Sequence, residues 1–257
     1  MTALVVAQGV SKRFGGVQAL SNVSFSIERG EIYGLIGPNG AGKTTLFNLL
    51  TGIYRVDEGS FTFDGQPLAG LKAHEVAARG VARTFQNIRL FANLSALENV
   101  MIGRHVRTHA GVFGAVLRTK ATVAEEAAIE HRAMELLEYV GIARRANDQA
   151  GSLPYGDQRR LEIARALATD PKLLALDEPA AGMNASETAA LKPLFERIRS
   201  GGVTLLLIEH DVKLVMGVCD RVLVLDHGEV IAEGRPPEVQ KNPKVVEAYL
   251  GTPMEGA

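Results

Sequence analysis

Cysteine is almost absent from this chain of 257 residues, which contains only Cys219. One thiol cannot form a disulfide within the chain, and this favours a reducing compartment. Long apolar runs are also missing, since a run such as residues 205–208 is far shorter than the roughly 18 apolar residues of a membrane-spanning helix. The first basic residue, Lys12, follows the apolar stretch at the start of the chain, which is the reverse of the order in a secretory signal. We therefore predict a cytoplasmic protein, which could still lie on a membrane through a partner.

The chain also lacks an excess of charge of one sign. Lys and Arg number 28 and Asp and Glu number 29, so the formal net charge is −1. This balance argues against a surface built to hold nucleic acid, and we predict no nucleic-acid partner. Hydrophobic residues make up 46% and charged residues 22%, which excludes a disordered chain.

Short runs with the composition of β-strands recur along the chain and predict an α/β fold. They lie at residues 5–10, 23–27, 32–36, 61–63, 173–176, 204–208, 222–225 and 230–232. The runs at 173–176 and 204–208 are almost wholly apolar, as expected for parallel strands covered on both faces. Turn-forming sequences at 28–30 and 57–59 separate the early runs and favour an antiparallel layer there.

The middle of the chain has a helical composition. Residues 124–139 combine strong helix formers with an apolar spacing that fits one helix face, and Gly141 supplies a helix end. We therefore predict a helical subdomain at residues 91–150, inserted into an α/β core of residues 1–90 and 151–257. Basic residues gather at 103–122, where the simpler interpretation is a solvated surface and the alternative is a patch that faces a partner or lipid headgroups.

A glycine-rich loop matches the pattern G-x-x-x-x-G-K-[ST] completely. It follows the predicted strand at 32–36, precedes an apolar helix that starts at Thr45, and consists of Gly37, Pro38, Asn39, Gly40, Ala41, Gly42, Lys43 and Thr44. Glycines let backbone N–H groups wrap around phosphates, and the helix N-terminus adds partial positive charge. Lys43 supplies a full charge toward the outer phosphates, and Thr44 supplies a hydroxyl ligand for Mg²⁺. This phosphate loop still leaves open a kinase, a GTPase, a helicase or a transport motor.

Two carboxylates follow a second apolar strand. Asp177 and Glu178 come directly after the run at 173–176, and ligands of open α/β sheets gather at the carboxyl ends of strands. Asp177 is therefore placed to organise Mg²⁺ and its water shell. Glu178 is the candidate to orient and polarise an attacking water, which is assistance worth about 10²–10⁴-fold in rate. Nucleotide kinases usually lack the second carboxylate, so the pair favours hydrolysis.

The order of motifs along residues 5–250 resembles that of the ATP-binding subunits of ABC transporters. Besides the two sites above, the likeness rests on the segment 153–159, Gln86, the turn at 181–184 and His210. The segments 80–86, 208–211 with 214–216, and 247–251 are most similar to the large-type ATPase of branched-chain amino acid importers. The resemblance implies a P-loop NTPase core that binds ATP and Mg²⁺ and hydrolyses ATP to power uptake through a membrane permease.

The resemblance also implies roles for single residues. Phe14 corresponds to the aromatic residue that stacks on adenine, since a π-face holds a flat base without reading its hydrogen-bond edge. Gln86 corresponds to the glutamine that touches Mg²⁺ and water, and His210 to the switch histidine near the γ-phosphate. The implied metal ligands are Thr44, Gln86 and Asp177, and the implied catalytic residues are Glu178, His210, Gln86 and Lys43.

The signature segment, which in this family contacts the partner's ATP, is Leu153, Pro154, Tyr155, Gly156, Asp157 and Gln158. It departs from the usual L-S-G-G-Q, because Pro154 replaces the serine hydroxyl and also lacks an N–H donor. Asp157 replaces the second glycine and is a candidate cap for the helix that follows. Asn184 stands where the family usually has Asp, which removes a charge from the turn that meets the partner.

These likenesses imply a two-state motor made of several chains. A second ATP-binding subunit, identical or a paralogue, would cover the γ-phosphate. Hydrolysis through Glu178 would then let the two subunits separate. Integral membrane permease subunits and an external substrate-binding protein complete the implied system, which places this chain on the inner face of the cell membrane. Two alternatives stay open, namely an ABC-type ATPase outside transport and a P-loop nucleotide kinase. A single set of motifs speaks against the first, and the signature segment speaks against the second.

Overall fold

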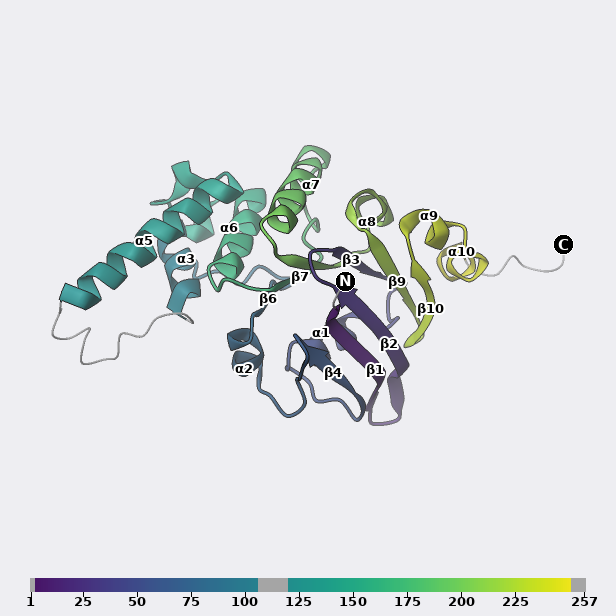
Figure 1. Cartoon of the computed structure of the whole chain (residues 1–257). Helices are drawn as coiled ribbons and strands as arrows, with labels where there is room; N and C mark the ends of the chain where they lie inside the picture. The colour runs from purple at the N-terminus through teal and green to yellow at the C-terminus, as the bar shows by residue number, and fades with distance from the viewer. Residues whose placement is uncertain (1–2, 106–119, 251–257) are drawn as a thin grey trace.

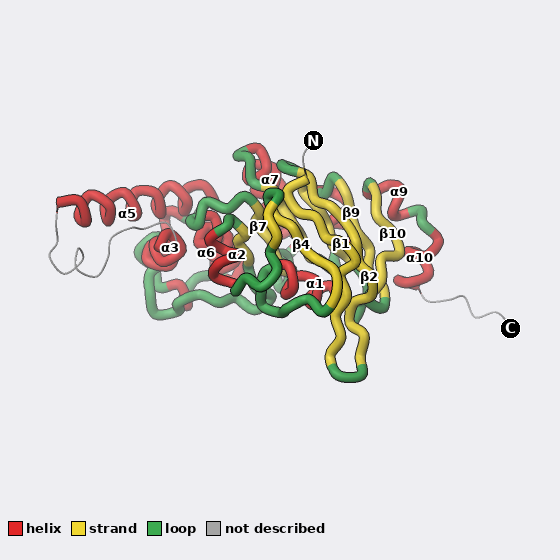
Figure 2. Tube along the Cα trace, turned by 60° about the horizontal axis from the view of Figure 1, so that its bottom comes forward, coloured by secondary structure: helices red, strands yellow, loops and turns green. Residues whose placement is uncertain are grey.

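The computed structural model describes residues 3–105 and 120–250, which form two β-sheets with helices around them. The N-terminal sheet is antiparallel in the order β2-β1-β4-β5. Its strands are β1 (Ala3–Phe14), β2 (Val17–Glu28), β4 (Glu58–Phe63) and β5 (Gln66–Pro67). The hairpin of β1 and β2 projects beyond the rest of the sheet (Figure 2). This sheet is the antiparallel layer that the early turn sequences predict.

The second sheet has six strands in the order β10-β9-β3-β8-β7-β6. Neighbouring strands are parallel except for the pair of β9 and β10. Every residue of β3, β7 and β8 is buried, as the apolar runs predict. The strands are β3 (Ile32–Ile36), β6 (Val81–Arg83), β7 (Leu173–Asp177), β8 (Thr204–Ile208), β9 (Arg221–Asp226) and β10 (Glu229–Gly234). The predicted α/β fold with a mainly parallel sheet is confirmed, although the short strands β5 and β6 were missed.

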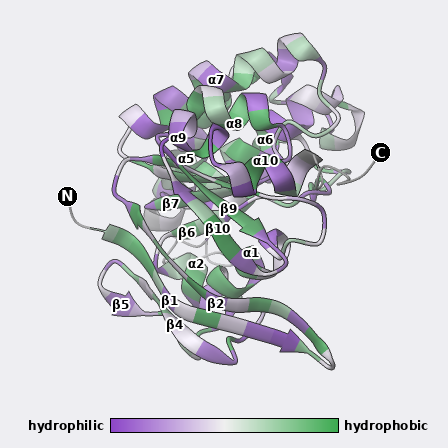
Figure 3. Ribbon diagram, turned by 90° about the vertical axis from the view of Figure 1, so that its right-hand side faces the viewer, coloured by the Kyte–Doolittle hydropathy of each residue, from purple (hydrophilic) through white to green (hydrophobic). Residues whose placement is uncertain are grey.

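Helix α1 (Lys43–Leu50) lies between the two sheets (Figure 3). Phe47 of this helix, Val23 of β2 and Leu35 of β3 belong to one buried apolar cluster. Because the helix is packed on both sides, its first turn has a fixed place relative to both sheets. The phosphate loop, which leads into that turn, is fixed with it.

The opposite face of the parallel sheet is covered by α6 (Tyr155–Leu167), α7 (Ala185–Ser200) and α8 (Val212–Val218). Leu161, Phe195 and Val215 of these helices share a second apolar cluster with Leu176 and Leu207 of the sheet. Helices α9 (Pro236–Gln240) and α10 (Pro243–Leu250) lie beside β9 and β10 (Figure 1). Helix α2 (Ala73–Ala78) precedes β6.

Helices α3 (Ala96–Arg104) and α5 (Lys120–Val140) pack on α6, on the side of the molecule away from α10 (Figure 1). Helix α5 contains the helix predicted at 124–139, and it ends before Gly141, whose φ of +83° suits glycine. Two 3₁₀ turns, Ala143–Arg145 and Ala150–Ser152, lead on to α6. Within residues 3–105 and 120–250, no helix has both the length and the apolar character needed to cross a bilayer. Most of the basic segment at 103–122 lies outside the described residues.

Candidate functional site

The phosphate loop joins β3 to α1, and its shape depends on glycine. Gly40 and Gly42 have φ angles of +82° and +100°, in the left-handed region that other residues disfavour. A Cβ atom on Gly37 would stand 2.1 Å from the carbonyl oxygen of Leu225, and one on Gly42 would stand 2.7 Å from that of Ala19. Strands β9 and β2 therefore approach the loop too closely for side chains at these two positions. The other predicted members of the loop are Pro38, Asn39 and Ala41, and Thr44 and Thr45 lie in the first turn of α1.

Lys43 is buried at the first position of α1. Its Nζ donates to the carbonyl oxygens of Gly37 at 2.6 Å and Pro38 at 2.9 Å. Burial lowers the pKa of Lys43, and the nearby carboxylates of Glu178 and Asp177 oppose that shift. A charged donor inside the loop, at the N-terminus of a helix, suits the oxygens of a phosphate chain.

Asp177 ends β7 with a buried carboxylate. Its Oδ2 lies 3.5 Å from the guanidinium of Arg83, and its backbone N–H donates to Oγ1 of Thr84 at 3.2 Å. Burial raises the pKa of Asp177, and the charge of Arg83 opposes that rise. Because β3, β7 and β8 run parallel, Asp177 lies at the same edge of the sheet as the phosphate loop.

Three residues that are far apart in the sequence, Gln86, Glu178 and His210, meet at this edge. Nε2 of Gln86 donates to Oε2 of Glu178 at 2.9 Å, and Nδ1 of His210 lies 3.7 Å from the same oxygen. Glu178 has a φ of +47°, and its N–H donates to the carbonyl of Ile208 at 2.8 Å, so β8 holds this uncommon conformation. The Glu178 side chain is 20% exposed. A carboxylate that solvent can reach, with an amide and an imidazole beside it, can orient a water molecule and accept its proton.

Glu209 is a fully buried carboxylate next to His210 that the sequence reasoning did not single out. Its Oε1 accepts the N–H of Ala180 at 2.9 Å, and no partner for its Oε2 is found among the described residues. Burial raises the pKa of Glu209. The side chain joins the turn after Glu178 to the loop that carries His210. Its sequence signal, a carboxylate directly after an apolar strand, is the same one that identified Glu178.

Phe14 is the last residue of β1, where the chain turns toward β2, and is 43% exposed. Its ring makes an edge contact with Tyr54, with centroids 5.3 Å apart, and Nζ of Lys12 lies 5.3 Å from its centroid. Although Lys12 and Tyr54 contact the ring, the exposed part of Phe14 can offer a surface for stacking. Sequence reasoning missed Tyr54 and Lys12, because the spacing of residues does not show which loop lies beside the hairpin.

The signature segment forms the start of α6. Pro154 is the N-cap residue, and its side chain makes no capping hydrogen bond. The prediction that Asp157 caps this helix is wrong, because the helix begins at Tyr155 and Asp157 lies within its first turn. Oδ2 of Asp157 lies 3.9 Å from the guanidinium of Arg145. Gln158 donates its side-chain N–H to the carbonyl of Leu153 at 2.8 Å, which satisfies an acceptor at the start of the helix.

Tyr155 and Gly156 lie against the turn before α7 and the first turn of that helix. A Cβ atom on Gly156 would stand 2.7 Å from Oε1 of Glu187, and one on Gly182 would stand 3.0 Å from the ring of Tyr155. Asn184 caps α7, since its side-chain oxygen accepts two N–H groups of the first turn at 3.0 Å. Asn and Asp cap helices about equally well, so capping of α7 does not require the negative charge of the Asp that the family usually has at position 184.

A buried ion pair ties α6 to the segment that carries Gln86. Arg159 donates to the carbonyl of Phe85 at 2.7 Å, to Glu162 at 3.1 Å and to the carbonyl of Gln86. Glu162 accepts the N–H of Phe85 at 3.2 Å. Burial raises the pKa of Glu162. The helix of the signature segment therefore holds the backbone at Gln86, a link that neither motif indicates by itself.

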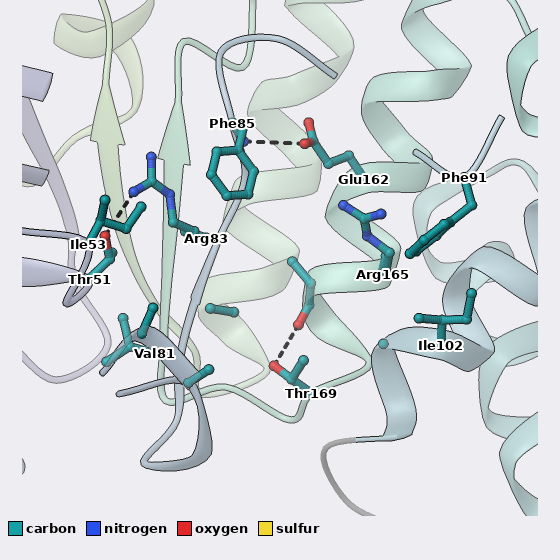
Figure 4. A pocket seen from close by; sticks show the side chains of 15 residues that line it. Thr51, Ile53, Val81, Arg83, Phe85, Phe91, Ile102, Glu162, Arg165 and Thr169 are labelled. Atoms are coloured by element: carbon teal, nitrogen blue, oxygen red, sulfur yellow. Dashed lines mark hydrogen bonds between the residues drawn. The ribbon is translucent and has the colours of Figure 1, made fainter. Parts of the chain in front are cut away.

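A cleft of about 390 Å³ lies beside this ion pair and extends to α3 (Figure 4). Apolar side chains dominate its wall, and the charged side chains of Arg83, Glu162 and Arg165 interrupt them. The apolar residues labelled in Figure 4 are Ile53, Val81, Phe85, Phe91 and Ile102. The cleft thus connects α3 and α6 with the residue that directly precedes Gln86.

Helix α10 faces the phosphate loop from the other side. A cavity of about 700 Å³ is lined by Pro38 and Asn39 of the loop and by Lys244 and Glu247 of the helix. Burial raises the pKa of Tyr249, and the backbone of Gly37 opposes that rise. The C-terminal segment is therefore in contact with the loop, which the sequence reasoning did not foresee.

Two protein families match this chain. Residues 20–181 match the family described as ABC transporter, and residues 229–254 match the one described as branched-chain amino acid ATP-binding cassette transporter. The chain is similar to the high-affinity branched-chain amino acid transport ATP-binding proteins LivG of Salmonella typhimurium, at 47% identity, and BraF of Pseudomonas aeruginosa, at 44%. Each alignment covers 96% of this chain and 98% of the relative. The lipopolysaccharide export system ATP-binding protein LptB of Escherichia coli is 35% identical, over 97% of this chain and 98% of LptB.

Solved structures show the same architecture. The ADP conformation of MJ1267, an ATP-binding cassette of an ABC transporter, has a TM-score of 0.85 at 32% identity and covers 98% of this chain and 100% of that chain. A dimer of the ATP-binding cassette MJ0796, in a post-hydrolysis state with ADP and Pi, has a TM-score of 0.77 at 26% identity. It covers 90% of this chain and 98% of that chain.

Proposed function

The chain belongs to the ATP-hydrolysing subunits of ABC transporters, and on this premise we propose that it powers the import of branched-chain amino acids. LivG and BraF, at 47% and 44% identity, support this cargo over lipopolysaccharide, since LptB is 35% identical. The match of residues 229–254 to the branched-chain family also supports it. Neither a nucleotide kinase nor an ABC-type ATPase outside transport gains support from these relatives.

The convergence of Gln86 and His210 on Oε2 of Glu178 is the observation that carries the catalytic part of the proposal. Glu178 would accept a proton from the attacking water, and Gln86 would orient both. His210, which is 60% exposed, would turn toward the γ-phosphate once nucleotide is bound. These three residues and Lys43 are the proposed catalytic set.

We propose that the phosphate loop and the first turn of α1, residues 37–45, hold the phosphates of ATP. Lys43 would exchange its two backbone carbonyl partners for phosphate oxygens, which accept stronger hydrogen bonds because they are charged. Phe14 would stack on adenine at the hairpin. The site would therefore bind the phosphates through many specific contacts, whereas stacking on Phe14 would discriminate little between one flat base and another.

The donors near the phosphate loop fit Mg²⁺. Thr44, Gln86 and Asp177 offer hydroxyl, amide and carboxylate oxygens, which this ion prefers. No group of three His, Cys, Asp or Glu within residues 3–105 and 120–250 forms an all-protein metal site, and Mg²⁺ commonly takes its remaining ligands from phosphates and water. When bound, Mg²⁺ would neutralise charge that develops on the phosphate oxygens.

Cassettes of this family dimerise, as MJ0796 does. We propose that residues 153–158 contact ATP held by a second subunit, either a copy of this chain or a paralogue. Pro154 supplies neither a hydroxyl nor an N–H, so the contact would depend on Gly156 and on the positive end of the α6 dipole. Each chain would then complete the site of the other.

Subunits of this family work with membrane permeases. We propose that residues 91–150 form a helical subdomain inserted into an ATP-binding core of residues 1–90 and 151–257, and that a permease segment docks in the cleft. The apolar wall with charged interruptions suits a short amphipathic helix, and Phe85 lies directly before Gln86. Docking would hold the chain at the inner face of the cell membrane, and an external binding protein would deliver the cargo.

Reconstitution of the chain with its permease and binding protein in lipid vesicles tests this proposal. ATP inside the vesicles should drive uptake of leucine, isoleucine or valine, and Glu178→Gln should abolish that uptake. ATP hydrolysis without uptake of any of the three would contradict the cargo. A chain that does not hydrolyse ATP in this setting would contradict the catalytic roles.

A further inference from the structure

Arg83 contacts three parts of the molecule at once: α1, Asp177 and the cleft. We propose that Arg83 is a positioning residue, which holds Asp177 in register with the phosphate-loop helix and links it to the cleft wall. This inference rests on the proposed function, because it treats Asp177 as a ligand of Mg²⁺ and the cleft as the docking site of the permease.

One edge of the guanidinium is fixed to α1. Nη1 of Arg83 donates to Oδ1 of Asn48 at 2.9 Å and to Oγ1 of Thr51 at 2.8 Å. Thr51 is itself fixed, since its hydroxyl donates to the carbonyl of Phe47 at 2.8 Å. Helix α1 begins at the phosphate loop, so Arg83 has a defined position relative to the residues that grip phosphate.

Another edge of the same group faces Asp177. Nη2 of Arg83 lies 3.5 Å from Oδ2 of Asp177, and the two side chains are only 12% and 8% exposed. A buried carboxylate is costly unless a charge compensates it, so this ion pair favours one position of the Asp177 side chain. Arginine can hold α1 and the carboxylate together because its five N–H donors form a rigid fork. The carboxylate is thereby placed relative to Thr44, the proposed hydroxyl ligand on α1.

The guanidinium of Arg83 also lies over two aromatic rings. Its central carbon is 4.3 Å from the centroid of Phe47 and 4.5 Å from that of Phe85. Arg83 and Phe85 both line the cleft (Figure 4), and the guanidinium carbon of Arg89 lies 4.4 Å from the centroid of the Phe85 ring. A segment that docks in the cleft would therefore touch Phe85 and Arg83. The Arg83 side chain itself reaches from the cleft to Asp177. Lysine at this position would keep the charge but lose both the fork and the flat faces.

The first experiment measures how much Mg²⁺ strengthens nucleotide binding, in chains that carry Glu178→Gln so that ATP is not consumed. The fluorescent analogue MANT-ATP is titrated in Mg²⁺ and in EDTA, with and without Arg83→Lys or Arg83→Met. We expect unchanged affinity in EDTA, because no phosphate contact is lost. We expect the gain from Mg²⁺ to fall by about 10-fold or more in both variants, as for other residues that orient a metal ligand. An unchanged gain in either variant would overturn the proposal.

The second experiment tests the link to the cleft with Glu178 intact. The rate of ATP hydrolysis is measured with and without the permease, and Arg83→Lys should lower the ratio of the two rates. An unchanged ratio would show that Arg83 does not connect the cleft with Asp177.

Arg221→Lys is the matched control for both experiments. Arg221 also stacks on a ring, Tyr33 at 5.3 Å, and pairs with a largely buried carboxylate, Glu31 at 3.4 Å, but it lies on β9. The Arg221→Lys variant should keep both the increase in MANT-ATP affinity caused by Mg²⁺ and the ratio of ATP hydrolysis rates with and without the permease. Thermal unfolding shows which variants are folded at the assay temperature. If the parent chain with Glu178→Gln fails to bind MANT-ATP even in Mg²⁺, the proposed function itself fails, whereas a loss confined to the Arg83 variants concerns this inference alone.

Discussion

Nε2 of Gln86 and Oε2 of Glu178 lie 2.9 Å apart, although 92 positions separate the two residues in the chain. Gln86 belongs to the segment that Arg159 of α6 holds, and Glu178 follows β7. The hydrogen bond therefore joins the helix of the signature segment to the proposed catalytic base. A shift of α6 relative to the sheet would therefore move Gln86 relative to Glu178 and change the hydrogen bond between them.

Glu178→Gln separates binding from hydrolysis. The amide keeps the size of the side chain but cannot accept a proton, so we expect the rate of ATP hydrolysis to fall by about 10²–10⁴-fold. ATP binding should persist, and the bound nucleotide should hold two chains together. Gel filtration in Mg-ATP should then show a dimer, and a purely monomeric elution would count heavily against a shared site. Glu196→Gln, an exposed position on α7, is the control and should leave both readouts unchanged.

Phe14→Ala tests the proposed adenine contact. Base–aromatic stacking is worth about 1–3 kcal/mol per base by alanine substitution, so the KM for ATP should rise while kcat changes little. Phe14→Tyr should keep the stacking face and a KM near that of the parent chain. Steady-state kinetics on both variants decide the matter, because a KM that is equal in Phe14→Ala and the parent would place adenine elsewhere.

Gly42→Ala tests the steric requirement of the phosphate loop. The added Cβ would stand 2.7 Å from a backbone oxygen, and the φ of +100° adds strain, so ATP binding should be lost. Gly65→Ala is the matched control, since its φ is also positive, at +73°, but nothing lies within 4 Å of the added atom. It should cost about 1–2 kcal/mol of stability and leave ATP binding intact, as measured by urea unfolding and nucleotide titration. Equal binding by the two variants would mean that crowding at Gly42 is unimportant.

The parts of the site that sequence predicted are those with a local pattern. The phosphate loop is a continuous motif, and the buried strands at 173–177 and 204–208 are nearly continuous apolar runs, so each carries its own signal. The capping role of Asp157 failed for a local reason as well. The N-cap residue is Pro154, so Asp157 lies inside the first turn, beyond the position from which a side chain caps a helix.

The contacts that were missed depend on which strands become neighbours. Arg83 meets Asp177 because β6 pairs with β7, and Glu209 lies beside the turn after Glu178 because β7 pairs with β8. That order does not follow the sequence, and β6 spans only Val81–Arg83, which is too short to give a periodic signal. No spacing rule could therefore have joined Arg83 to Asp177, and the signal at Glu209, a carboxylate after an apolar strand, does not show that it lies beside the turn after Glu178.

Glu209→Gln should change how stability depends on pH. Burial raises the pKa of Glu209 in the folded state above its ordinary value of 4.5. At pH values between the unfolded-state and folded-state pKa, the folded state therefore binds more protons than the unfolded state. This carboxyl therefore makes the chain less stable as the pH rises through the folded-state pKa. The variant lacks that titration, so its stability relative to the parent should improve as the pH rises from the ordinary value of 4.5 upward. Urea unfolding across this range measures the difference, and a difference that does not vary with pH would contradict the prediction.

The buried pair of Arg159 and Glu162 allows stability and catalysis to be measured separately. Arg159→Met removes the cation that donates to buried Glu162 and leaves only the weaker charge interaction with Arg165, so it should cost up to about 3–5 kcal/mol of unfolding free energy. Adding Glu162→Gln removes the buried carboxylate charge while keeping an acceptor for the N–H of Phe85, so the double variant should recover most of the lost stability. Neither variant restores the bonds from Arg159 to the carbonyls of Phe85 and Gln86. If those bonds position Gln86 against Glu178, ATP hydrolysis stays low in the double variant even though its stability returns. Recovery of both quantities together would instead assign the pair to stability alone.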